Sequence, residues 1–177
     1  MRRPRRVLPL SACRPPATPQ TAPVSEHRHL PHLRPFAPQP IVFLTAVTAQ
    51  RRPTLACPAA LAALREIWQA SPEVDGWFVG DFLLMPDHVH LFARAALDAR
   101  PLAQWVGSWK SLSARRLKTE PGFAPPLWQR DYFDRFLRSA DDYSEKWNYV
   151  AQNPVRQGLC AAAGDWPWRG RLFDLQF

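Results

Sequence analysis

Four apolar runs after residue 40 predict β-strands. Ile41–Thr48 is rich in β-branched and aromatic residues, which favours a buried strand. Trp77–Leu84 and His88–Arg94 are two further runs of this kind, and the proline-containing turn at residues 85–87 connects them as a hairpin. Asp131–Leu137 predicts the fourth strand.

Three segments repeat apolar residues at the helical period. The first helix is predicted over Ala59–Gln69, and the sequence at 71–73 (Ser-Pro-Glu) is expected to end it. The second helix is predicted over Leu102–Leu117. The third is predicted over Ser139–Gln152, with the serine as N-cap, because Pro154 cannot continue a helix.

The predicted order is strand, helix, two strands, helix, strand, then a last helix. This order is typical of an α+β fold of the ferredoxin-like, split βαβ type, with both inner helices on one face of an antiparallel sheet. Residues 39–177 are therefore expected to form a single domain. Residues 1–38 are rich in proline and arginine without apolar periodicity, and they predict a disordered arm.

The amino-acid composition indicates what class of partner the protein binds. The 177 residues are 46% hydrophobic, which indicates a folded protein, and carry a net charge of +8. That charge favours a polyanionic partner, nucleic acid ahead of an anionic membrane surface. No apolar run is long enough to span a membrane, and the three scattered cysteines fit neither a disulfide framework nor a zinc site. We expect a cytoplasmic protein without membrane contact.

Two histidines alternate with apolar residues on the third predicted strand. His88 and His90 share one face of that strand, because successive side chains point to opposite faces. Neutral imidazoles placed side by side could bind a divalent metal ion. They could equally be two buried histidines, and the spacing leaves both interpretations open.

The last helix carries a second polar pair. Tyr143, Trp147 and Val150 recur at the helical period and predict its buried stripe. Tyr149 lies away from that stripe, and Asn153, four residues later, shares its face. A tyrosine hydroxyl and an amide that face away from a core are candidates for chemistry.

These features together resemble a known family. The His88-Val89-His90 strand, Tyr149 with Asn153, and the sequences at 128–130 (Trp-Gln-Arg) and 166–168 (Trp-Pro-Trp) resemble the single-tyrosine HUH transposases, specifically the REP-associated tyrosine transposase branch. The resemblance extends over residues 27–172. Many insertion-sequence relatives have glutamine in place of Asn153, whereas asparagine is typical of the REP-associated branch.

The resemblance implies a metal-dependent transposase and endonuclease acting on single-stranded DNA. His88, His90 and Asn153 would bind the divalent metal ion. The family implies Mg²⁺ or Mn²⁺, whereas imidazole ligands alone favour Zn²⁺ or Mn²⁺. Tyr149 would attack the phosphate and form a covalent 5′-phosphotyrosine that conserves the energy for rejoining. The implied substrate is single-stranded or hairpin DNA at REP-type palindromes. The resemblance is compatible with either a monomer or a homodimer.

Basic and aromatic side chains are the expected contacts to this DNA, since aromatic rings stack on bases and cations follow the backbone. Each could instead have a structural or merely solvated role, Trp128 above all. The candidates are Arg51, Arg52, Lys110, Arg115, Arg116, Trp128 and Arg130.

Two other classes of function fit part of the pattern. A sequence-specific DNA-binding protein without catalysis would share the basic charge but would not need Tyr149. A metal-dependent nuclease that uses water would need both histidines but could dispense with the tyrosine.

Overall fold

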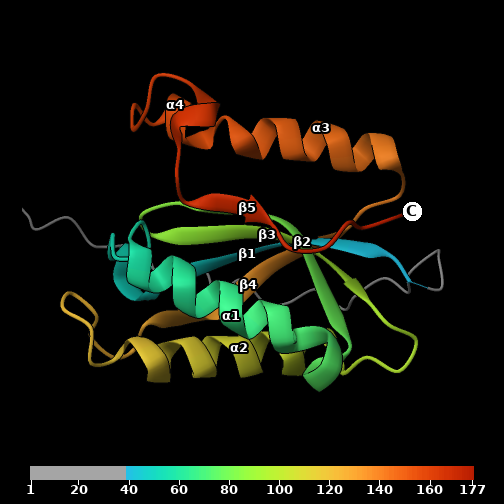
Figure 1. The fold of residues 1–177 in the computed structure, drawn as a ribbon, viewed down its shortest axis with the longest axis horizontal. Helices are drawn as coiled ribbons and strands as arrows, with labels where there is room; N and C mark the ends of the chain where they lie inside the picture. The colour runs from blue at the N-terminus through green and yellow to red at the C-terminus, as the bar shows by residue number, and fades with distance from the viewer. Residues whose placement is uncertain (1–38) are drawn as a thin grey trace, which may run out of the picture. The chain divides into compact units, whose positions relative to one another are not determined.

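A five-stranded antiparallel sheet forms the centre of the fold in the computed structural model, which describes residues 39–177 (Figure 1). The strand order is β4-β1-β3-β2-β5, and the first four strands confirm the predicted ferredoxin-like arrangement. The arm predicted over residues 1–38 lies outside the described residues. The strands are β1 (Ile41–Thr48), β2 (Trp77–Leu84), β3 (His88–Ala95), β4 (Trp128–Phe136) and β5 (Arg169–Arg171).

Helices cover both faces of this sheet. The first two pack side by side on one face, as predicted, and the last two lie over the opposite face (Figure 1). None of the helices within residues 39–177 is long and apolar enough to cross a membrane. The helices are α1 (Pro58–Asp75), α2 (Leu102–Leu117), α3 (Ala140–Ala151) and α4 (Asn153–Arg156), with short 3-10 helices η1 (Ala49–Arg51) and η2 (Ala163–Asp165).

Each face of the sheet has its own core. Between the sheet and the first two helices, Trp68 and Trp109 are buried, with their rings edge-on at 5.7 Å. On the other face, Tyr143 and Trp147 of α3 pack against Phe92 of β3, with ring centroids 4.5 and 5.9 Å apart. The predicted buried stripe of the last helix is thereby confirmed, and it fixes which side of α3 faces the sheet.

Helix α1 continues beyond its predicted end, so the predicted break at residues 71–73 is wrong. Pro72 lies in the last turn of the helix, and the buried hydroxyl of Ser71 accepts a hydrogen bond from the indole of Trp105 at 2.6 Å. The helix ends instead at Gly76, whose φ of 73° is left-handed and whose N–H donates to the carbonyls of Pro72 and Ser71.

Two further differences concern the edges of the sheet. Strand β4 begins at Trp128, earlier than the predicted Asp131, because Trp128 pairs with Thr48 beyond an irregularity in the ladder. Strand β5 was not predicted, since three residues are too short for a periodic signal. It pairs with β2 at Asp81 to Leu83.

Candidate active site

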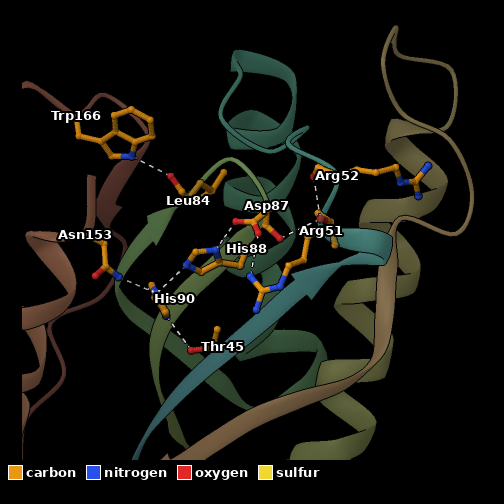
Figure 2. Close-up of polar contacts among 10 residues, drawn as sticks. Thr45, Arg51, Arg52, Leu84, Asp87, His88, His90, Asn153 and Trp166 are labelled. Carbon is orange, nitrogen blue, oxygen red and sulfur yellow. Dashed lines mark hydrogen bonds and ion pairs between the residues drawn. The ribbon is translucent and has the colours of Figure 1, made fainter. Parts of the chain in front are cut away.

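The two histidines of β3 lie on the sheet face that α3 covers. His90 stands opposite Thr45 of β1 and Leu83 of β2. Leu83 belongs to the core beneath α3, so the histidine side chains point toward the same side. Figure 2 shows both rings, with their Nε2 atoms 3.1 Å apart.

The other nitrogen of each ring has its own partner. The Nδ1 atom of His88 lies 2.6 Å from a carboxylate oxygen of Asp87, and the Nδ1 atom of His90 lies 2.8 Å from the hydroxyl of Thr45 (Figure 2). When His88 is neutral and its Nδ1–H donates to this carboxylate, its Nε2 carries no proton. If Thr45 likewise accepts from His90, both Nε2 lone pairs point at one shared position.

Charge and burial keep this pair suited to binding a cation. Burial lowers the pKa of His90 to about 3, and the positive charges of a protonated His88, of Lys146 and of Arg156 lower it further, against the opposing charge of Asp87. Burial works to raise the pKa of Asp87, but its hydrogen bond to His88 and the charges of His88 and Arg51 outweigh this and lower it. A neutral His90 beside an ionised Asp87 is the state that a metal ligand needs.

The turn before β3 holds Asp87 in place. Its backbone carbonyl accepts hydrogen bonds from the N–H and the hydroxyl of Thr48, at 2.8 and 2.9 Å. Its carboxylate also accepts a hydrogen bond of 3.0 Å from the guanidinium of Arg51, which belongs to the η1 segment (Figure 2). Gln50 and Arg51 have φ values of 57° and 52°, a left-handed backbone that costs about 1–3 kcal/mol for each such residue. This strain is found where Arg51 reaches the aspartate beside His88.

Asn153, the first residue of α4 just after the end of α3, contacts the histidines. Its side-chain nitrogen lies 3.0 Å from Nε2 of His90 (Figure 2), so the two polar pairs seen in the sequence meet. Its side-chain oxygen accepts a hydrogen bond from Arg156, and the same guanidinium donates to the backbone carbonyl of Tyr149 at 2.8 Å. Arg156 thus joins Asn153 to the helical turn that carries Tyr149.

Tyr149 is exposed and lies close to two cations. Its side chain is 62% exposed, as its position off the buried stripe predicts. The Arg156 guanidinium lies 4.0 Å from the ring centroid, and the Lys146 ammonium lies 5.8 Å from it. Lys146 is also 4.9 Å from the ring of Phe43, which stacks on His90 at 5.5 Å. The tyrosine therefore adjoins the histidine pair through a short chain of contacts.

The other two tyrosines have structural surroundings. The hydroxyl of Tyr143 donates to Asp81 at 2.6 Å, and Arg171 of β5 donates twice to the same buried carboxylate, at 3.0 and 2.7 Å. Burial and Asp81 together raise the pKa of Tyr143. Burial raises the pKa of Tyr132 to about 12, with the charge of Asp134 adding to it. Tyr143 therefore fastens α3 to β2 and β5, and Tyr149 is the exposed hydroxyl of the three.

The side chains around His88 and His90 include few groups that can bind a metal ion. Within residues 39–177, no group of three or more His, Cys, Asp and Glu side chains is placed to hold a metal. The amide of Asn153 is a further polar side chain that meets the Nε2 atom of His90. The two converging Nε2 atoms and the adjacent amide fit a divalent ion, provided that the amide turns its oxygen toward His90.

Two of the predicted DNA contacts lie inside the protein. Lys110 is buried, and its ammonium donates to the carbonyls of three successive β4 residues, 129–131, at 2.5 to 3.3 Å. Trp128 is 7% exposed, and its indole donates to the hydroxyl of Ser113 at 2.9 Å. A ring and an ammonium placed in this way support α2 and β4.

The predicted arginines are nearer to solvent but are not gathered at one place. Arg51 is 69% exposed in its pair with Asp87, and Arg116 pairs with Glu66 at 2.8 Å. Arg52 donates to the carbonyls of Ala49 and Pro126. Arg115 and Arg130 are exposed on α2 and β4. Only Arg51 is in contact with the residues around the histidines.

The sequence reasoning missed several groups at the site. Asp87 directly precedes His88, and a carboxylate beside a candidate ligand is a usable signal. Arg156 lies two helical turns after Tyr149, but its spacing alone does not separate it from the chain's other arginines. Lys146 gave no signal, because its contacts depend on how the last helix packs against the distant first strand.

Comparison with known proteins gives consistent results. The family model described as "Transposase IS200 like" matches residues 41–153. A curated protein of Haemophilus influenzae, described as a candidate REP-associated tyrosine transposase, is 24% identical over 94 residues, which cover 48% of this chain. The match spans 53% of that relative, so the chain corresponds to about half of its length.

A solved structure shows the same fold. A REP-associated tyrosine transposase bound to a REP hairpin superposes with a TM-score of 0.65 and 16% identity, covering 83% of this chain and 95% of the other. A candidate transposase from Deinococcus radiodurans has a TM-score of 0.49 and 21% identity, covering 68% of this chain and 95% of the other.

Proposed function

Because the chain belongs to the IS200-like transposase family, we propose that it cleaves and rejoins single-stranded DNA through a covalent 5′-phosphotyrosine on Tyr149. The observation that carries this proposal is the contact between Asn153 and His90, which brings the exposed tyrosine's helix to the histidine pair. A catalytic tyrosine, a positioned amide and two imidazoles are the groups that phosphodiester transfer by this route requires.

The cleavage step balances with groups of this chain and the substrate. The Tyr149 oxygen forms a bond to the phosphorus, and the bond between the phosphorus and the 3′-oxygen breaks. The phenolic proton leaves through solvent, and the departing 3′-oxygen takes up a proton to become a free hydroxyl. Attack by that hydroxyl on the phosphotyrosine reverses the step, so rejoining needs no further energy source.

The surrounding residues prepare the tyrosine and the phosphate. His88, His90 and Asn153 would hold Mg²⁺ or Mn²⁺, which when bound would polarise the scissile phosphate and offset its charge. Lys146 and Arg156 both lie close to the Tyr149 ring, where their positive charges attract the DNA backbone. Asp87 and Thr45 orient the two rings through hydrogen bonds at their Nδ1 atoms.

The proposed substrate is single-stranded DNA, or a hairpin with an unpaired flank, of REP type. The net charge of +8 supports a nucleic-acid partner. The solved relative is described as bound to a REP hairpin, and the same class of DNA is proposed for this chain, acting in the cytoplasm.

The proposal is tested by looking for the covalent intermediate. Labelled single-stranded DNA from around the protein's own gene is incubated with the protein in Mn²⁺, and the products are separated on a denaturing gel. We expect a labelled adduct that carries the 5′-phosphate end, and peptide mapping should place it on the peptide containing Tyr149. Tyr149→Phe should lose the adduct while retaining DNA binding, and Tyr143→Phe serves as the matched control that keeps it.

The other outcomes separate the remaining classes. Cleavage with a free 5′-phosphate and no adduct would indicate a nuclease that uses water. Binding without any cleavage, also in Mn²⁺, would indicate a DNA-binding protein alone. His88→Ala and His90→Ala should each abolish cleavage, and activity retained by either variant would contradict the metal-site proposal.

A further inference from the structure

An aromatic side chain lies in line with the histidine site on the edge strand. Phe133 of β4 pairs with Thr45 of β1, and Thr45 pairs with His90 of β3. Directly opposed residues of antiparallel strands point to the same face, so the three form one row across the sheet. Neighbouring strands are about 4.8 Å apart, so the backbone of Phe133 lies about 10 Å from that of His90.

This phenylalanine is left open to solvent. Its side chain is 58% exposed, whereas Phe92, beneath the aromatic residues of α3, is fully buried. The ring of Phe133 meets Phe43 edge-on at 6.4 Å, and Phe43 stacks on His90. Phe133 therefore continues the line of rings that begins at the histidines, and its outer side is uncovered.

Two cations lie near these rings. The ammonium of Lys146 lies 4.9 Å from the Phe43 ring, and Arg135, two residues after Phe133, is exposed on the same face of β4. A flat apolar ring with cations nearby fits an unpaired nucleotide, because the base can stack on the ring while its phosphate meets the cations. An apolar protein partner would not account for this charge.

We propose that Phe133 is the stacking platform for an unpaired nucleobase next to the scissile phosphate. The proposal rests on the proposed strand-cleaving function for the place of the phosphate, but the stacking itself requires no chemistry. Stacking of a base on an aromatic ring tolerates any sequence, so Phe133 would position the strand without reading it. The role is therefore one of binding, separate from the attack by Tyr149.

The test measures base stacking without metal. A short oligothymidylate with a single 2-aminopurine is titrated in EDTA, with anisotropy for binding and 2-aminopurine fluorescence for stacking. We expect the wild-type protein to quench the probe at saturation. Phe133→Leu should abolish the quenching and weaken binding about 5- to 150-fold, which corresponds to the loss of one stacked base. Phe133→Trp should retain both, because it keeps an aromatic face.

Phe177→Leu is the matched control. Phe177 is 55% exposed and its ring lies beside Tyr143, so this variant removes an equally exposed phenylalanine elsewhere. We expect it to quench and bind like the wild type. Absence of quenching by the wild type, quenching retained by Phe133→Leu, or equal loss in Phe177→Leu would each overturn the proposal.

The two proposals fail separately. Quenching that depends on Phe133 in a protein that forms no covalent adduct would leave the stacking site standing and refute the proposed function. An adduct on Tyr149 together with unchanged quenching in Phe133→Leu would support the proposed function and refute the stacking site.

Discussion

The side-chain nitrogen of Asn153 lies 3.0 Å from Nε2 of His90, while its side-chain oxygen accepts a hydrogen bond from Arg156. A metal ligand must offer the oxygen, because the amide nitrogen has no lone pair available. The amide must therefore turn over before it can share a cation with His90. Arg156 opposes that turn, and it also contacts the ring and carbonyl of Tyr149.

The first prediction concerns this arginine. Arg156→Met keeps the apolar stem and removes the guanidinium, so the Asn153 amide is released while the Tyr149 turn loses two contacts. The wild type must break the hydrogen bond from Arg156 to Asn153 before the amide can bind a metal ion, whereas the variant has no such bond to break. We therefore expect the variant to bind Mn²⁺ up to about tenfold more tightly. The rate of strand cleavage should fall. Mn²⁺ titration followed by EPR and single-turnover kinetics would measure the two effects.

Arg115→Met is the control for that experiment, since Arg115 is exposed on α2, away from the histidines. It should leave Mn²⁺ affinity unchanged. Weaker metal binding by Arg156→Met would show that the guanidinium supports the ligand set and does not oppose it.

The second prediction concerns the carboxylate beside His88. Asp87→Asn preserves shape but replaces a charged acceptor by a neutral one, so the His88 ring becomes a weaker donor to a cation. Loss of such an outer partner typically lowers metal affinity about 10- to 100-fold. Isothermal titration with Mn²⁺ would measure this, and Asp98→Asn, an exposed aspartate after β3, provides the comparison. Equal affinities in both variants would assign Asp87 a role in the turn alone.

Much of the fold could be predicted because its signals are local. The β-branched run of β1 and the helical period of α2 set those elements at their observed bounds. The histidine pair and the tyrosine were recognisable for the same reason, since alternation and an i+4 spacing determine which side chains share a face. Pro72 misled because proline is a strong breaker in a helix interior, whereas here it falls in the last turn before Gly76.

The remaining features depend on distant pairings. The burial of Lys110 and Trp128 follows from where β4 meets α2, and their residue types suggested exposure or stacking instead. The proximity of Arg51 to Asp87 requires the loop after β1 to reach the turn before β3. The exposure of Phe133 depends on β4 being an edge strand. Such relationships carry no periodic signal in the sequence.

The third prediction tests how α3 is fastened to the sheet. Tyr143→Phe keeps the ring against Phe92 but removes the hydroxyl that donates to Asp81. Asp81 keeps its hydrogen bonds from Arg171, so we expect the free energy of unfolding to fall by only about 1–2 kcal/mol. Urea denaturation would measure the change. Unchanged stability would mean that Arg171 alone holds this carboxylate.

The last prediction uses the buried lysine. Lys110→Met removes the donor to three β4 carbonyls, and we expect a loss of about 1–3 kcal/mol in the free energy of unfolding at neutral pH. The salt dependence of DNA binding should not change, because this ammonium is not presented to phosphates. A shallower dependence on salt would place Lys110 on the DNA after all.

The effect of Lys110→Met on the free energy of unfolding should also depend on pH. Burial lowers the pKa of Lys110 to about 8, partly offset by Asp131, against 10.5 in the unfolded chain. Between these values the unfolded lysine still binds a proton that the folded one has released, so this group's contribution to stability rises with pH from about 8 to 10.5. The difference in unfolding free energy between wild type and Lys110→Met should therefore grow across that window. Lys118→Met, which removes an exposed lysine at the end of α2, should show no such trend. A constant difference for Lys110→Met would mean that its ammonium keeps an ordinary pKa.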